Sequence, residues 1–328
     1  MNIIYASDNN YAEILGVSVI SLFENNKQEP QINVYILDDG ISEENKEKLN
    51  QIFAKYGRTG IYLQIPDLNQ LAGIQIDSQR WSLSTFSRLF LNELLPQSVE
   101  KILYLDCDIL VEGSLKPLWS MDMDGYVLAA VPDCISPAHK KNVGLKPDDF
   151  YINAGVLFLN MKEWRKQNVQ QLCVDFIQQM NGKIPYVDQG VLNNVLKGKM
   201  KPLPLIYNVY SVLYDFSYQN LIKYRKPGNF YTQKEVEEAV KNPVVVHFTA
   251  SFLSLRPWVK GSKHPFAKNW VHYKQLSPWK DTPLWEDKRS GYKKAYEAFY
   301  HAMPLPFSVW MSGMLHSTLL PFMQRHSK

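Results

Sequence analysis

Apolar residues along this chain alternate between the two-residue period of a strand and the longer period of a helix, which restricts the possible folds more than any other feature. Asn2–Ser7 predicts a strand, Tyr11–Phe23 a helix and Gln31–Leu37 a second strand. Further strands are expected at Gly60–Ile65, Lys101–Leu105, Tyr126–Val131, Val156–Asn160 and Pro243–Phe248, and further helices between Ser42 and Gly57, over Ser84–Leu95 and over Glu163–Met180. This order predicts an α/β fold with a mostly parallel sheet covered by helices on both faces, which binds ligands at the carboxyl ends of its strands.

The end of the chain differs in composition from the rest. Residues 1–255 carry 24 Lys and Arg against 28 Asp and Glu, whereas residues 256–328 carry 12 against 4 and also five of the eight tryptophans. We therefore expect one compact domain over 1–255 and a basic, Trp/Tyr-rich helical segment over 256–328. Cationic and aromatic side chains together suit an anionic membrane surface, and because no nucleic-acid-binding motif accompanies them, nucleic acid is not expected as a partner. The alternative is that these helices pack on the preceding domain.

No secretory signal or membrane-spanning stretch is predicted. The chain starts without a basic and then apolar leader, and its most apolar late stretch, Met303–Met323, is interrupted by proline, histidine, serine and threonine. Three cysteines without a CxxC pair predict neither a disulfide framework nor a cysteine zinc site. We expect a cytoplasmic protein that attaches peripherally to the inner face of the cell membrane.

The strongest local signal is an apolar strand, Lys101–Leu105, that ends in Asp106 and Asp108. Side chains two residues apart in an extended backbone point to the same side, so both carboxylates can hold one hard cation together with a diphosphate. Oxygen ligands favour Mg²⁺ or Mn²⁺ over zinc. Because Asp-x-Asp is a common sequence, a solvated turn is the alternative. His247 ends another apolar strand and, taken by itself, is more typical of a hydrogen-bonded core histidine than of a metal ligand.

Six blocks that occur in one order resemble glycosyltransferase family 8, the retaining group that contains bacterial lipooligosaccharide galactosyltransferases and glycogenin. The blocks are Ile3-Ile-Tyr-Ala-Ser-Asp8-Asn-Asn10, Ser84-Thr-Phe-Ser-Arg88, Leu103-Tyr-Leu-Asp106-Cys-Asp108, Asn153-Ala-Gly155, Asp188-Gln189-Gly190, and His247-Phe with the later Arg256-Pro-Trp258. The resemblance covers about residues 2–258. It implies a GT-A type, Rossmann-like catalytic domain, a UDP-galactose or UDP-glucose donor, and Mn²⁺ or Mg²⁺ held by Asp106, Asp108 and His247.

The same resemblance assigns the donor-binding residues. It implies that the loop after the first strand holds the uridine, that Arg88 contacts the diphosphate or sugar hydroxyls, and that Asp133 lies in the sugar pocket. The full set is Ala6, Ser7, Asp8, Asn10, Arg88, Cys107, Asp133, Asn153, Ala154, Gly155, Asp188, Gln189 and Arg256. Plainer alternatives are an Asx turn for the first loop, a solvated helix face for Arg88, a bulge for the Asn-Ala-Gly block and helix capping for Asp188.

Asp188, Gln189 and Asp106 are the catalytic candidates. By the resemblance, Gln189 lies on the reactive side of the anomeric carbon and Asp188 accepts a sugar hydroxyl. Retention requires either a carboxylate nucleophile about 3 Å from that carbon or a front-side attack in which leaving phosphate and incoming hydroxyl share one face. A glutamine amide is a poor nucleophile, so we expect front-side substitution, with a β-phosphate oxygen accepting the acceptor's proton.

The sequence departs from the family pattern in two places. Between His247 and Arg256 the loop is longer than usual, and Arg256 replaces a phosphate-binding lysine, so its contact with the diphosphate stays open. Trp81 lies where some relatives carry a histidine near the acceptor, so the choice of acceptor does not carry over.

These patterns together predict a retaining hexosyltransferase that moves galactose or glucose from a UDP-sugar to a glycan acceptor and forms an α-glycosidic bond. The expected acceptors are a bacterial surface polysaccharide, a lipid-linked oligosaccharide or a glycoprotein glycan. A non-catalytic nucleotide-sugar sensor or scaffold of a polysaccharide-assembly complex is the alternative, which the retained Asp106, Asp108, His247 and Gln189 disfavour. A sugar-1-phosphate nucleotidyltransferase is disfavoured because the first loop lacks glycine and lysine.

Overall fold

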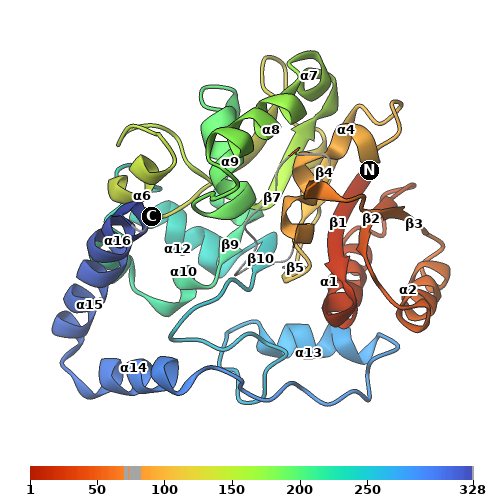
Figure 1. The fold of residues 1–328 in the computed structure, drawn as a ribbon. Coiled ribbons are helices and arrows are strands. Elements are labelled where there is room, and N and C mark those ends of the chain that lie inside the picture. The colour runs from red at the N-terminus through yellow and green to blue at the C-terminus, as the bar shows by residue number, and fades with distance from the viewer. Residues whose placement is uncertain (70–72, 74–82, 327–328) are drawn as a thin grey trace.

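The computed structural model describes residues 1–69, 73 and 83–326, and its main feature is a seven-stranded sheet in the order β3-β2-β1-β4-β7-β6-β8 (Figure 1). Its strands are β1 (Asn2–Asp8), β2 (Asn33–Asp39), β3 (Thr59–Gln64), β4 (Lys101–Leu105), β6 (Leu128–Pro132), β7 (Ile152–Asn160) and β8 (Met200–Pro202). Within this sheet β7 runs antiparallel to β4 and β6, and the other pairs are parallel. The predicted α/β fold with a mostly parallel sheet is confirmed.

Alternate side chains of the central strands enter two different hydrophobic cores. Ile3 and Tyr5 of β1 pack with α1 on one face, whereas Ile4 packs on the other face. The first face is covered by helices that include α1 (Ala12–Asn25), α2 (Glu43–Lys55), α5 (Lys116–Trp119), α10 (Val212–Asp215), α11 (Tyr218–Arg225), α12 (Gln233–Lys241) and α13 (Ala267–Gln275). The second face is covered by η2 (Leu83–Leu89), α4 (Leu91–Leu94), α7 (Met161–Lys166), α8 (Val169–Gln179) and α9 (Val187–Val195).

A second, three-stranded sheet lies at the carboxyl end of β4. It contains β5 (Ile109–Val111), β10 (Val245–His247) and β9 (Val209–Tyr210), in the order β5-β10-β9. Cys107 and Asp108 form the turn that carries the chain from β4 into β5, and the register of the small sheet places His247 opposite Ile109. The predicted aspartates and the predicted histidine therefore meet where the two sheets join.

Two predicted helices are wrong in detail. Ser84–Leu95 forms the 3₁₀ helix η2 followed by the short α4, because residues 86–91 are all buried and tertiary packing overrides a one-sided helical pattern. Glu163–Met180 is split into α7 and α8 at Asn168, whose backbone is left-handed with φ 51°. Asparagine tolerates this conformation better than most residues do.

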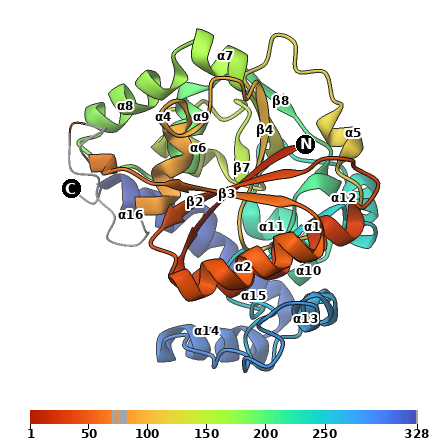
Figure 2. The same ribbon diagram turned by 90° about the vertical axis from the view of Figure 1, so that its right-hand side faces the viewer.

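The C-terminal segment has two unlike parts. Trp258, Trp270 and Trp279 are buried in the core that contains α1, and Trp285 pairs with Val259 in an isolated bridge. Beyond them, α14 (Gly291–Ala302) leads to α15 (Leu305–Met314), a π-helical turn η4 (Leu315–Leu319) and α16 (Leu320–His326). Figure 1 shows α16 beside α6 (Pro137–Asn142), while Figure 2 shows α13 and α14 below the sheet. Among the described helices, none is long and apolar enough to cross a membrane.

Candidate active site

Asp106, Asp108 and His247 form a cluster in which one ligand atom of each lies within 4.8 Å of the others. The Nε2 atom of His247 is 3.6 Å from Asp106 Oδ2 and 3.3 Å from Asp108 Oδ1. Hydrogen bonds hold the backbone of both aspartates: the Asp106 N–H donates to the backbone carbonyl of Gly155, and the Phe248 N–H donates to the backbone carbonyl of Asp108. Two carboxylates and one imidazole are a ligand set that suits a divalent metal such as Mn²⁺.

The hydrogen bonds behind His247 orient it as a metal ligand. The amide of Asn208 donates to Asn153 Oδ1 at 2.8 Å, so its own oxygen faces the imidazole, with Nδ1 at 3.0 Å. This network assigns the proton to Nδ1 and leaves the Nε2 lone pair directed at the aspartates. The absence of a side chain at Gly155 lets the His247 ring approach the aspartates, because a β-carbon at this position would lie only 2.1 Å from His247 Cε1.

The charges of the cluster are mutually dependent. Burial opposes the imidazolium, but the carboxylates of Asp108 and Asp106 outweigh burial and raise the pKa of His247. Burial also opposes the ionised form of Asp108, yet His247 and then Arg256 lower its pKa. The raised pKa means that Nε2 of His247 also takes up a proton readily, and a divalent cation held by these residues would compete with that proton.

Arg88 is buried and bridges two acidic sites. One is the cluster of Asp106, Asp108 and His247, called the metal-type cluster below, and the second acidic site is the buried carboxylate of Asp188. Its guanidinium donates to Asp106 Oδ1 at 2.8 Å and to Ala154 O at 2.7 Å, and its Nε is 3.0 Å from Asp188 Oδ2. The same group stacks over the ring of Tyr104, 4.0 Å from the centroid. The alternative of a solvated helix face for Arg88 is wrong.

Both ends of the Gln189 amide are engaged. Its oxygen accepts the Ala154 N–H at 3.0 Å, and its nitrogen donates to Asp133 Oδ2 at 3.1 Å and to Tyr151 Oη at 3.3 Å. Asp188, next to it in α9, is 3% exposed. Burial raises the pKa of Asp188 to about 6, and the positive charge of Arg88 offsets only part of that effect.

The predicted uridine loop lies at the adjoining edge of the sheet, at the end of β1. Asp8 accepts the Tyr11 N–H at 3.0 Å and so caps the short 3₁₀ helix η1 (Asn9–Tyr11), whose Asn10 is exposed. Ser7 donates to Asp8 O, and the Cys107 thiol donates to Ala6 O at 3.0 Å, which ties this loop to the turn between the two aspartates.

Arg256 reaches this cluster despite its longer loop. Its guanidinium donates to Asp108 Oδ2 at 3.1 Å, to Tyr11 Oη at 2.9 Å and to Phe248 O at 2.9 Å. It also lies over the Trp258 ring, 5.5 Å from the centroid. A cation therefore stands between the uridine loop and the metal-type cluster.

Comparison with known proteins agrees with this geometry. The family model "Glycosyl transferase family 8" matches residues 2–260. This chain belongs to that family. It is 28% identical to General stress protein A of Bacillus subtilis (strain 168) over 85% of this chain and 94% of that protein, and 28% identical to a lipopolysaccharide 1,2-glucosyltransferase of Escherichia coli over 92% and 83%. The crystal structure of galactosyltransferase LgtC with donor and acceptor sugar analogs superimposes with a TM-score of 0.71 at 26% identity, covering 86% of this chain and 99% of LgtC.

The predictions of a family 8 member with a GT-A type fold and of a retaining hexosyltransferase are therefore confirmed. As a member of this family, this glycosyltransferase takes a nucleotide-sugar donor and a glycan acceptor, and its Asp-Asp-His cluster can hold a divalent metal.

The contacts above link most of the predicted site residues, with Asn10 exposed beside them, and the predictions missed some of their partners. Asn208, Tyr104 and Tyr151 each bond to a predicted residue. Tyr104 lies two residues before Asp106 on the same side of β4, a signal that the two-residue period offered. Asn208 lies at the start of the weakly periodic stretch 207–240, where no local pattern marked it. Trp81 lies outside the described residues.

Proposed function

We propose that this enzyme transfers galactose, or alternatively glucose, from the UDP-sugar to a glycan with retention, using Mn²⁺ at Asp106, Asp108 and His247. The observation that carries the proposal is the convergence of these three ligands beside the Arg88–Asp188 ion pair. When bound, Mn²⁺ neutralises charge on the diphosphate and so stabilises the departing UDP. Residues 1–255 are proposed as the catalytic domain.

We assign the other donor contacts by their position. The loop through Ala6, Asp8 and Asn10 is proposed to hold the uridine, and Asp8 exchanges its bond to the Tyr11 N–H for the uracil edge. Arg256 is proposed to meet the diphosphate, because it already lies between this loop and Asp108.

The sugar contacts follow from the second acidic site. Asp133, Asn153 and the Ala154–Gly155 backbone are proposed to line the hexose pocket. Arg88 holds Asp188 in place, and above a pH of about 6 the carboxylate is available to accept a sugar hydroxyl.

The contacts of Asp188 and Gln189 favour front-side substitution over a covalent intermediate. A nucleophile must approach the anomeric carbon freely, but Asp188 is buried and paired with Arg88, and the Gln189 amide is held at both ends. The acceptor hydroxyl then attacks from the face that UDP leaves, and its proton passes to a β-phosphate oxygen. Gln189 orients the Ala154 backbone and lines the reactive side.

Proton NMR of donor hydrolysis tests the proposal directly. With Mn²⁺ and no acceptor, water replaces the missing hydroxyl, and we expect slow consumption of UDP-galactose, or of UDP-glucose, with the α-anomer of the free sugar appearing first. First appearance of the β-anomer contradicts retention. A covalent hexosyl adduct on Asp188, detected by mass spectrometry, contradicts front-side substitution.

We also propose that the enzyme acts in the cytoplasm at the inner face of the cell membrane, on a surface polysaccharide, lipid-linked or glycoprotein glycan. Support comes from exposed apolar side chains on the last helices, including Trp310 at 58%, Phe322 at 60% and Met323 at 53%. Four of the five C-terminal tryptophans pack within the protein, so Trp310 is the ring available for a membrane interface.

Vesicle co-sedimentation tests the membrane proposal. We expect binding to vesicles of phosphatidylcholine and phosphatidylglycerol in equal parts, weaker binding to phosphatidylcholine alone, and loss of binding in a Trp310→Ser/Phe322→Ser variant. The matched control is Leu172→Ser, at an exposed apolar residue of α8. Equal binding by the double variant and the control contradicts attachment through these helices.

A further inference from the structure

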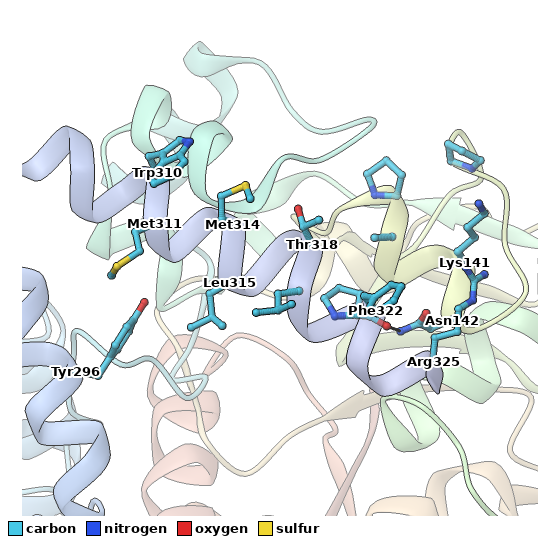
Figure 3. Close-up of a pocket in the computed structure, with 15 residues that line it drawn as sticks. Lys141, Asn142, Tyr296, Trp310, Met311, Met314, Leu315, Thr318, Phe322 and Arg325 are labelled. Carbon is cyan, nitrogen blue, oxygen red and sulfur yellow. Dashed lines mark hydrogen bonds between the residues drawn. The ribbon is translucent and has the colours of Figure 1, made fainter. Parts of the chain in front are cut away.

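A long apolar groove runs between α6 and the C-terminal helices, and its lining does not include Asp106, Asp108 or His247. It encloses about 980 Å³, and its walls include Met311, Met314, Leu315, Leu319 and Phe322 (Figure 3). This volume is near the upper end of the range of roughly 300–1,000 Å³ typical of sites for small organic ligands. The apolar lining excludes a free sugar as its occupant and suits a hydrocarbon chain.

One end of the groove is cationic. Lys141 of α6 and Arg325 of α16 lie together at the end opposite Tyr296 (Figure 3). Both are exposed, and neither forms a salt bridge with a carboxylate in the part of the chain that the structure describes. An apolar channel that ends in two available cations is complementary to an amphiphile with an anionic head.

The cationic end adjoins the catalytic site. Next to Lys141, Asn142 donates to Tyr186 Oη at 3.2 Å, and Tyr186 in turn donates to Gln324 Oε1 of α16 at 2.8 Å. Tyr186 stands two residues before Asp188, in a left-handed turn with φ 63°. These two hydrogen bonds connect the cationic end of the groove to the turn that leads into Asp188 and Gln189.

We propose that this groove binds the hydrocarbon chain of a lipid-linked glycan acceptor, with the acceptor's phosphate at Lys141 and Arg325 and its glycan directed toward Asp188 and Gln189. A lipid-phosphate-glycan has its three parts in the same order as the groove, the cations and the site. The inference rests on the proposed transferase function and adds the chemical class of its acceptor. A bulk membrane lipid has no glycan to extend into the site.

Calorimetry with dodecyl phosphate below its critical micelle concentration tests the groove itself. We expect one molecule to bind per chain, inorganic phosphate not to bind, and affinity to fall at least about tenfold in Leu315→Trp, which fills the groove, and in Lys141→Gln/Arg325→Gln. The controls are Leu305→Trp, an exposed residue of α15 outside the lining, and Lys263→Gln/Lys268→Gln, which removes the same charge elsewhere on the surface. Equal losses in the variants and their controls overturn the proposal.

Sugar transfer to a lipid-linked glycan tests whether this glycan is the ligand of the groove. Lipid-linked glycan extracted from a strain that lacks the gene is offered intact or after mild-acid removal of its lipid, and hydrolysis of the donor is measured in parallel. We expect the wild type to show a KM at least about tenfold lower for the intact form, and Leu315→Trp to lose this preference with donor hydrolysis unchanged. Equal use of both forms, or use of neither while hydrolysis persists, overturns the inference. Loss of hydrolysis in the wild type instead contradicts the proposed transferase function.

Discussion

The cationic side chains differ between two regions of the molecule. They are paired with carboxylates at the donor end, which comprises the metal-type cluster, Arg88, Asp188 and Arg256, and, in the described part of the chain, unpaired at the C-terminal groove. At the donor end, Arg88 and Arg256 are each bonded to carboxylates, and His247 is held by Asn208. At the groove, Lys141 and Arg325 face solvent beside apolar side chains. Cations that are already paired with carboxylates hold the reacting groups in one geometry before the donor binds. Unpaired cations beside an apolar surface are instead free to bind an anionic ligand. We therefore expect damage to one region to leave the function of the other intact.

Replacement of Arg88 should have the largest effect on stability and activity, because Arg88 pairs with two carboxylates of the donor end and, among the described residues, with none at the groove. Arg88→Ala leaves the buried Asp188 and the partly buried Asp106 without their shared cation, and we expect a decrease of about 3–5 kcal/mol in the free energy of unfolding together with loss of donor hydrolysis. Urea denaturation measures the first effect. Arg58→Ala, at an arginine that donates to two backbone carbonyls, is the control and should change stability by no more than about 2 kcal/mol with donor hydrolysis unchanged.

Gly155→Ala tests the difference between the two regions most selectively, because it adds a single methyl group at the donor end. The added β-carbon overlaps the His247 ring and displaces it, so we expect Mn²⁺ affinity to fall by about 10- to 100-fold while dodecyl phosphate binding is retained. Titration calorimetry measures both ligands. Gly113→Ala is the control, since its added carbon has no described neighbour closer than 3.4 Å. Unchanged Mn²⁺ affinity in Gly155→Ala contradicts the role of His247.

Acidity should weaken metal binding at the donor end. Because the pKa of His247 is raised, Mn²⁺ must displace a proton, and affinity should fall by about tenfold for each pH unit below that pKa. Above that pKa the dependence should vanish. Calorimetry in two buffers of different ionisation enthalpy measures the proton released, and no release at low pH contradicts the assignment.

The smallest effect is expected where the two regions touch. Gln324→Ala removes the hydrogen bond from Tyr186 and should lower the free energy of unfolding by about 1 kcal/mol without changing donor hydrolysis. Thermal unfolding and UDP release measure the two quantities. A decrease in hydrolysis of tenfold or more means that the groove and the donor site are coupled rather than separate.

Local sequence patterns predicted the main sheet and pointed to the Asp106–Asp108 pair, because each depends on residues close in the chain, whereas the other donor-site assignments came from the resemblance to the family. The two-residue period placed β1, β2 and β4, and the Asp106–Asp108 pair marked the end of a strand. The resemblance to the family brought in His247, which spacing had left as a core histidine.

Features made by distant segments escaped prediction. Asn208 acts through bonds to residues 39 and 55 positions away, so no local spacing marks it. Burial on all sides turned the predicted helix around Arg88 into a 3₁₀ helix. The groove forms only when α6 meets the last helices, where a π-helical turn is present.

UDP release from UDP-galactose and UDP-glucose, with and without Mn²⁺, tests the central claim most directly when wild type is compared with Asp108→Asn. We expect the wild type to turn over one of the donors only when Mn²⁺ is present, and Asp108→Asn to lose at least about 99% of that activity. The control, Asp122→Asn, removes an exposed carboxylate elsewhere on the chain and should match wild type. Equal turnover by wild type and Asp108→Asn, or turnover independent of the metal, contradicts a metal-held donor at the Asp-Asp-His cluster.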